Sequence, residues 1–302
     1  MTAQNLPLKG IRVIDYSHFL AGPFVGRCLA TLGAEVIKVE RPKEGDAGRT
    51  HPSFKDGQSG YYLQQNMGKQ GLCVDLRDRR GLELMLKLVD TADVFIENYR
   101  PGALERLGLG YKALSARNPM LIYCSVSAYG HTGPYADRAG FGLIAEAMSG
   151  AMAQLGNPGE VPPLLRMPLA DMYTGIHGVA AINAALVGRA SSGRGQHIDL
   201  ALYDCMVSMH DYAVQSYFLS GGTDLPRQTG SGQPDSTVYG IFPAKDGNLV
   251  IAAQVDDAWR RLAMLVGGEA LAADERFAKR VTRNAVAQMA HARCACYDPG
   301  SR

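Results

Sequence analysis

A strand–helix–strand pattern fills the first forty residues, and it constrains the fold more than any other feature. Residues 11–16 form a short, β-branched apolar run typical of a buried strand. Pro23 suits the first turn of a helix, which we predict to continue over 24–32 and to end at Gly33. Residues 35–40 are a second strand. Such a unit requires parallel strands joined by a right-handed crossover.

The alternation continues along the chain. It predicts an α/β fold, with a Rossmann-like parallel sheet, flanking helices and a smaller, incomplete α/β domain. We expect a large Rossmann-like domain over 1–220, a glycine-rich linker or loop over 221–236 and a partial small domain over 237–302. Further strands are predicted at 71–76, 93–98, 120–127 and 195–201, and helices at 80–92, 143–155, 172–189 and 203–219.

Composition excludes several classes of protein. The 302 residues are 46% hydrophobic with a net charge of +2, so no nucleic-acid partner is expected. Neither a signal peptide nor an 18-residue apolar stretch occurs, so we expect a soluble, cytoplasmic protein with no membrane partner.

Cys294 and Cys296, near His291, could be half of a zinc site. No second pair completes it, and we expect no metal.

A dinucleotide-binding site is the obvious alternative for a strand–helix–strand unit in which Glu40 ends the second strand. The first turn contradicts it. Residues 17–23 read Ser-His-Phe-Leu-Ala-Gly-Pro instead of the glycine pattern that lets a pyrophosphate approach the backbone. No phosphate-binding loop motif occurs elsewhere.

Asp171 stands where a helix is predicted to begin. Unpaired N–H groups and the helix dipole favour an ionised carboxylate there, and such a group can act as a nucleophile. The alternative is an ordinary helix N-cap, worth about 1 kcal/mol of helix stability.

Six short segments, in order and at matching spacing, resemble the class III CoA-transferases. This family includes formyl-CoA, carnitine-related and succinyl-CoA:dicarboxylate transferases, and the resemblance extends to about Ala278. The segments are 13–23, 33–42, 97–102, 130–135, 171–175 and 193–196.

The resemblance implies a mechanism in which Asp171 is the nucleophile. It would attack a CoA thioester to give a mixed anhydride, become a CoA ester, and then be released by an acceptor acid. Coenzyme A and acyl-CoA would be substrates, with no tightly bound cofactor. The partners would be acyl-CoA and a small carboxylic acid.

Other positions match family contacts with CoA. Arg41 matches an arginine at the nucleotide, and residues 18–21 match the loop along the pantetheine, although His18 taken alone would more often be a structural histidine. Gly230, Gly232 and Gln233 resemble a glycine-rich active-site loop, with a plain linker as the alternative. The CoA contacts implied are His18, Leu20, Ala21, Arg41, Val74, Asp75, Leu76, Arg77, Asn98 and Arg106.

Departures from the family narrow the substrate. Leu20 replaces a glutamine of formyl-CoA transferases, which disfavours formate and oxalate. Gly142 replaces an acidic residue, and the run 139–148 is similar to the subgroup that uses succinyl-CoA and dicarboxylic acids. A racemase of α-methylacyl-CoA would need a histidine where Phe141 stands, so that alternative is disfavoured.

The C-terminal part departs further. Family-like sequence fades after residues 274–278, so we expect a chain truncated relative to the family, without the segment that closes an interlocked dimer. A homodimer is expected only if the fold is complete. The competing interpretation is an inactive, truncated remnant that binds CoA.

Overall fold

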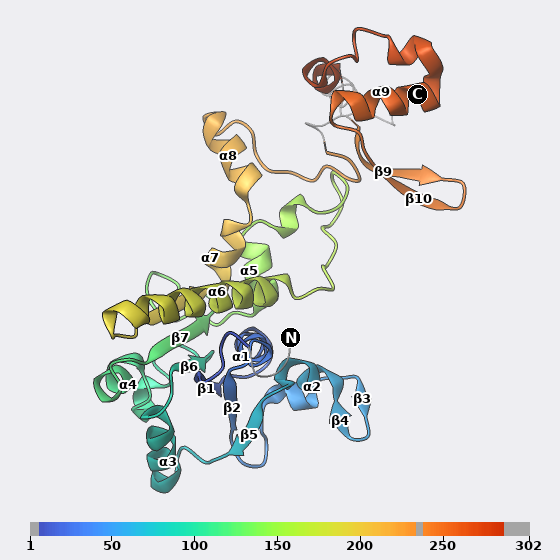
Figure 1. Ribbon diagram of the computed structural model, residues 1–302. Coiled ribbons are helices and arrows are strands. Elements are labelled where there is room, and N and C mark those ends of the chain that lie inside the picture. The colour runs from blue at the N-terminus through green and yellow to red at the C-terminus, as the bar shows by residue number, and fades with distance from the viewer. Residues whose placement is uncertain (1–5, 234–237, 287–302) are drawn as a thin grey trace. The chain divides into compact units, whose positions relative to one another are not determined.

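The computed structural model describes residues 6–233 and 238–286 (Figure 1). The strands are β1 (Arg12–Tyr16), β2 (Glu35–Glu40), β3 (Phe54–Lys55), β4 (Gln58–Ser59), β5 (Gln70–Cys73), β6 (Val94–Glu97), β7 (Ile122–Ser127), β8 (His197–Ala201), β9 (Tyr239–Ala244) and β10 (Gly247–Ala252). The α-helices are α1 (Ala21–Thr31), α2 (Gly60–Asn66), α3 (Arg79–Val89), α4 (Tyr111–Arg117), α5 (Gly142–Met148), α6 (Leu169–Ser192), α7 (Leu202–Ser208), α8 (Asp211–Leu219) and α9 (Asp256–Ala272). Short 3₁₀ turns are η2 (Ala47–Thr50), η3 (Glu105–Leu107) and η4 (Met152–Gln154).

The central sheet confirms the predicted Rossmann-like fold. Its six strands run in the order β5-β2-β1-β6-β7-β8, and every pair is parallel. The chain therefore builds outward from β1 on one side and then from β6 on the other. Ligands of such sheets bind where this order reverses, at the carboxyl ends of the two central strands.

Alternate residues of the strands belong to two separate hydrophobic cores, one on each face of the sheet. Val13, Ile96 and Cys124 pack on the face that α1, α5, α6 and α7 cover. Ile14 and Phe95 point the other way, toward α3 and α4. Both faces of the sheet are thus buried, which explains why its strands read as continuous apolar runs.

Two glycines let α6 lie close against α1. A β-carbon on Gly175 would lie 2.4 Å from the Phe24 ring, and one on Gly178 would lie 2.9 Å from Val25. This contact fixes the first half of α6, which carries Asp171, against α1. Helix α1 directly follows the loop after β1, residues 17–20, which is called the first loop below.

Three helices differ from the sequence prediction. The single helix expected over 203–219 is two, α7 and α8, separated at Met209 and His210. The helix expected over 143–155 ends at Met148, because Gly150 adopts a positive φ of 84°. The helix expected from residue 172 begins at Leu169, which places Asp171 inside its first turn.

The chain divides into two compact units, the first of residues up to 151 with 165–214, and the second of residues 152–164 with those from 215 onward. The second unit contains the antiparallel pair β9–β10 and α9. Arg283, which is 1% exposed, joins its parts by donating to the carbonyls of Gln254 and Phe277.

Candidate active site

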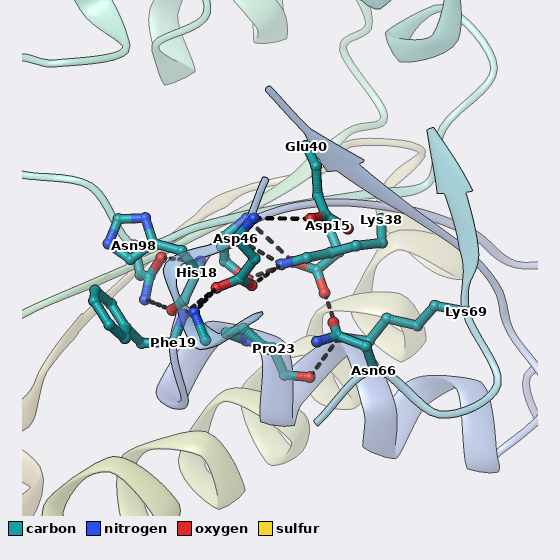
Figure 2. A network of polar contacts seen from close by, with 12 residues as sticks. Asp15, His18, Phe19, Pro23, Lys38, Glu40, Asp46, Asn66, Lys69 and Asn98 are labelled. Carbon is teal, nitrogen blue, oxygen red and sulfur yellow. Dashed lines mark hydrogen bonds and ion pairs between the residues drawn. The ribbon is translucent and has the colours of Figure 1, made fainter. Parts of the chain in front are cut away.

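The loops after β1 and β6 meet at the point where the strand order reverses. The Asn98 side chain joins them: its Oδ1 accepts the His18 N–H at 2.8 Å, and its Nδ2 donates to the His18 carbonyl at 2.8 Å. Figure 2 shows this pair of bonds beside Phe19. Asn98 therefore fixes the backbone of the first loop from the neighbouring central strand.

Phe19 in the same loop has a left-handed backbone, with φ of 62°. A non-glycine residue pays roughly 1–2 kcal/mol for this conformation. The buried Asp46 offsets that cost, since its Oδ1 accepts the N–H of Phe19 at 3.0 Å and of Gly48 at 2.8 Å. One carboxylate thus ties the loop after β1 to the loop after β2.

Two buried lysines pair with the carboxylates of this arrangement (Figure 2). Lys38 Nζ lies 2.9 Å from Asp46 Oδ2 and 3.8 Å from Asp15 Oδ1, and Lys69 Nζ lies 2.6 Å from Asp15 Oδ2. Burial alone would raise the pKa of Asp15, but the two ammonium groups outweigh it and lower the pKa. The buried charges are therefore paired, as burial requires.

Glu40, the acid that invited a dinucleotide interpretation, is held by protein donors. Arg49 binds both of its oxygens, at 2.7 and 2.8 Å, and the Tyr62 hydroxyl donates at 2.6 Å. Burial opposes ionisation, yet these bonds lower the pKa of Glu40 to about 2. The Glu40 carboxylate is therefore bonded to other side chains of the protein.

A cavity of about 440 Å³ opens at the same edge of the sheet. Asp171 lines it, together with residues of the first loop, the loop after β6 and the segment before α5. Its polar and aromatic lining includes His18, Phe19, Asn98, Tyr99, Arg100, Arg106, Ser127, Arg138 and Phe141. A smaller cavity of about 160 Å³ is lined by Arg41 and shares His18, Phe19 and Tyr99 with it.

Asp171 is the third residue of α6, and within residues 6–233 and 238–286 nothing donates a hydrogen bond to its carboxylate. The capping alternative is therefore wrong. The stabilisation of the ionised form that we expected from the helix end is also outweighed by other effects. Burial, with the nearby Glu146 carboxylate, raises the pKa of Asp171 to about 6. Near neutral pH the group is a largely ionised, unpaired carboxylate facing the cavity.

The first turn of α5 packs on that of α6. A β-carbon on Gly142 would lie 2.3 Å from Asp171 Oδ2 and 3.6 Å from the Ala170 side chain. One turn later, Glu146 Oε1 accepts the Ala170 N–H at 3.1 Å. The first turn of α5 therefore packs directly against the Asp171 carboxylate.

The sequence-predicted CoA contacts fall into three groups. His18, Leu20, Ala21, Asn98 and Arg106 line the larger cavity with Asp171. Arg41 lines the smaller one, where its half-exposed guanidinium pairs with Glu44 at 3.0 Å. Val74, Asp75, Leu76 and Arg77 follow β5 and, among the described residues, line neither of these two cavities.

The predicted glycine-rich loop belongs to the second unit. There the Gly230 N–H donates to the Gly156 carbonyl at 3.0 Å, and Gln233 N–H donates to Tyr239 at 3.0 Å, while Gly232 pairs with Gly240. Its role at the active site stays a prediction. The residues of the suggested half zinc site, 291–296, lie outside the described residues.

Sequence patterns did not point to Arg100 and Arg138, which line the cavity, or to Asp46 and Glu146, which accept backbone N–H groups of the loop after β1 and of α6. Glu146 alone carried a signal, because it is the one charged residue in the otherwise apolar run 141–148. The others stand in polar loops, where charged residues are common.

No helix in the described part of the chain is long and apolar enough to cross a bilayer.

Comparison with known proteins agrees with this geometry. The model of CoA-transferase family III matches residues 8–295, which extends past Ala278, where we expected the resemblance to end. The chain is 42% identical to succinate–glutarate CoA-transferase of Agrobacterium fabrum, over 94% of this chain and 72% of the relative. It is 38% identical to succinyl-CoA–D-citramalate CoA-transferase of Chloroflexus aurantiacus, over 92% and 69%.

Solved structures give the same result. A CaiB/BaiF family protein from Brucella suis superposes with a TM-score of 0.82 at 41% identity, covering 96% of this chain and 77% of that one. The protein Rv3272 of Mycobacterium tuberculosis superposes with a TM-score of 0.83 at 35% identity, covering 95% and 76%. The chain belongs to CoA-transferase family III and is a class III CoA-transferase.

Proposed function

We propose that this enzyme moves CoA from a succinyl-CoA-like donor to a carboxylic or dicarboxylic acid, with Asp171 as the nucleophile. The observation that carries the proposal is a carboxylate to which no group of the described residues donates a hydrogen bond, and which lines a cavity of about 440 Å³. Asp171 is half-buried, and a carboxylate withdrawn from water in this way that serves only structure is normally hydrogen-bonded or paired.

The charges of the cavity fit anionic substrates. Arg100, Arg106 and Arg138 line it, and none forms an ion pair with a carboxylate of the described residues. Arg138 is held over the Tyr135 ring, 3.9 Å from its centre. Guanidinium groups bind carboxylates and phosphates bidentately, so three of them suit an acyl-CoA and the free carboxylate of a dicarboxylic acid.

The chemistry proceeds through two anhydrides. The Asp171 carboxylate attacks the thioester carbonyl, the C–S bond breaks and CoA leaves as thiolate. The thiolate attacks the aspartyl carbonyl, releasing the donor acid as carboxylate and leaving Asp171 as a CoA thioester. The acceptor carboxylate attacks the aspartyl carbonyl of that thioester, which releases CoA thiolate and forms a second mixed anhydride. The thiolate then attacks the acceptor's acyl carbonyl, which gives the new acyl-CoA and frees the Asp171 carboxylate.

The substrate class rests on the relatives and on the first loop. The two curated relatives described above are named for succinate with glutarate and for succinyl-CoA with D-citramalate. Leu20 is buried at the start of α1, where it offers a small polar acid no hydrogen bond. We therefore expect dicarboxylates of the size of succinate, glutarate and citramalate to be better acceptors than formate or oxalate.

An exchange screen tests the proposal. Succinyl-CoA is incubated with single carboxylic acids, and new CoA esters are identified by mass spectrometry. Quenching during turnover should trap CoA on Asp171. Asp171→Asn should abolish both signals, whereas Asp56→Asn, at an exposed turn, should leave them unchanged.

Three results separate the alternatives. Full exchange by Asp171→Asn would refute its role, and no exchange by the wild type with any acid would favour the inactive remnant. Deuterium uptake at the α-carbon of a 2-methylacyl-CoA would favour the racemase, although Phe141, 71% exposed at the cavity, offers no proton. The homodimer and the cytoplasmic location stay predictions, and sizing in solution tests the first.

A further inference from the structure

Glu146 is a buried carboxylate on the apolar side of a short helix. It is 3% exposed, and the neighbouring Gly142 and Ala145 of α5 are also buried. A carboxylate without a role is normally excluded from such a position, because its desolvation costs several kcal/mol. Its position therefore requires a compensating interaction.

That interaction lies at the start of α6. The residue at the N-cap position is Pro168, which has no side-chain acceptor to offer. The first N–H groups of a helix need acceptors from outside it. Glu146 Oε1 supplies one to Ala170 at 3.1 Å, from a different helix. The capping function considered for Asp171 is thus performed by Glu146, and in the described part of the chain no donor bonds the Asp171 carboxylate.

We propose that Glu146 is a positioning residue for Asp171: it holds the first turn of α6 through the Ala170 N–H and sets a second negative charge behind the nucleophile. The inference rests on the proposed function, because it defines Glu146 by its effect on an Asp171 that attacks thioesters.

The charge has a kinetic consequence. Asp171 is an anion before attack, and it is neutral as an anhydride or a CoA ester. Repulsion from Glu146 therefore destabilises the resting carboxylate and disappears as the new bond forms, which favours acylation. The direction agrees with the elevated pKa of Asp171, about 6, to which burial contributes most and Glu146 contributes second.

Other charged or titratable groups face the same carboxylate. Tyr61 of α2 is close enough that burial, with Asp171 and Asp46, raises its pKa to about 12. His18, Arg100, Arg106 and Arg138 share the cavity with Asp171. None of these groups changes in a Glu146 variant, so the charge effect is separable.

The test compares two substitutions in the full chain. Glu146→Gln keeps an oxygen acceptor for Ala170 and removes the charge, whereas Glu146→Leu removes both. The acid limb of kcat/KM for succinyl-CoA exchange, centred near pH 6 in the wild type, should move to lower pH in Glu146→Gln. Dividing the variant profile by the wild-type profile cancels titration of the substrates. Glu83→Gln, an exposed glutamate of α3, is the matched control.

The two variants should also differ in rate. At pH 7.5 Glu146→Gln should lose a few-fold in kcat, and Glu146→Leu at least tenfold, because α6 loses its external acceptor. An acid limb of Glu146→Gln that superposes on the wild type, or a fully active Glu146→Leu, would overturn the inference. Thermal unfolding separates loss of fold from loss of rate. Failure of the proposed function looks different: the wild type would itself show no exchange, or Asp171→Asn would keep it.

Discussion

Gly142 lies against the Asp171 carboxylate so closely that a β-carbon on it would be 2.3 Å from Oδ2. Non-bonded carbon and oxygen atoms do not approach to this distance. The backbone of α5 therefore defines how far the carboxylate can turn away from the cavity. Gly142 is thus a direct neighbour of the proposed nucleophile.

Gly142→Ala should impair the chemical step. The added methyl must displace the Asp171 carboxylate or separate α5 from α6, and small displacements of a reacting group cost orders of magnitude in rate. We expect kcat for exchange to fall at least tenfold, with a smaller change in KM. Gly188→Ala is the control, because a β-carbon there meets nothing within 4 Å and alanine favours the helix. Unchanged kcat in Gly142→Ala would show that the carboxylate does not need its present position.

Lys38→Met should destabilise the whole first unit. Lys38 is 1% exposed between Asp46 and Asp15, and its loss leaves two buried carboxylates with less compensation. Breaking a buried pair on one side costs about 3–5 kcal/mol. Urea unfolding followed by circular dichroism measures it. Arg79→Ala, which removes the exposed pair with Glu83, should leave the midpoint unchanged. Equal midpoints for Lys38→Met and the wild type would contradict the importance of this pair.

The sheet could be predicted from sequence for a physical reason. Strands buried on both faces are continuous apolar runs, as at residues 35–40 and 93–98, and the turns between them carry glycine or proline. Helix ends were less predictable. Gly150 breaks α5 by its conformation, and nothing in the sequence says which glycine of a helical pattern will adopt a positive φ.

The active site was predictable only where it follows a strand. His18 and Asn98 come directly after β1 and β6, so the parallel sheet brings them together. Asp46 and Glu146 could not be found this way. Their partners, Phe19 and Ala170, are 27 and 24 residues distant in sequence, and each contact is from a side chain to a backbone N–H, which leaves no pattern in residue types.

Asn98→Ala should raise KM for acyl-CoA. The substitution removes both hydrogen bonds that hold the His18 backbone, at 2.8 Å each, and frees the loop on which Phe19 is strained. Each lost bond is worth about 1 kcal/mol, so together they allow roughly a tenfold or larger effect on kcat/KM. Steady-state kinetics with succinyl-CoA measure it, with the exposed Asn248→Ala as control. If kcat/KM stays at the wild-type value, the loop does not depend on this clamp.

A second buried acid predicts how stability depends on pH. Glu97 is 2% exposed at the end of β6, where its Oε2 accepts the Tyr99 N–H at 2.8 Å and His131 Nε2 lies 3.7 Å from its Oε1. Burial, reinforced by Glu105, raises the pKa of Glu97 from 4.5 to about 8. The folded protein therefore keeps a proton on Glu97 that the unfolded chain loses.

The free energy of unfolding should accordingly fall as the pH rises from 4.5 to 8, by an amount on the order of 4 kcal/mol from this group. The sign follows because the unfolded state binds fewer protons throughout that interval. Glu97→Gln, which is neutral at every pH, should match the wild type near pH 4.5 and exceed it at pH 8.5. Urea unfolding at both values, with the exposed Glu83→Gln as control, measures the difference. A wild type that is as stable as Glu97→Gln at pH 8.5 would mean that the folded protein accommodates the ionised Glu97 carboxylate.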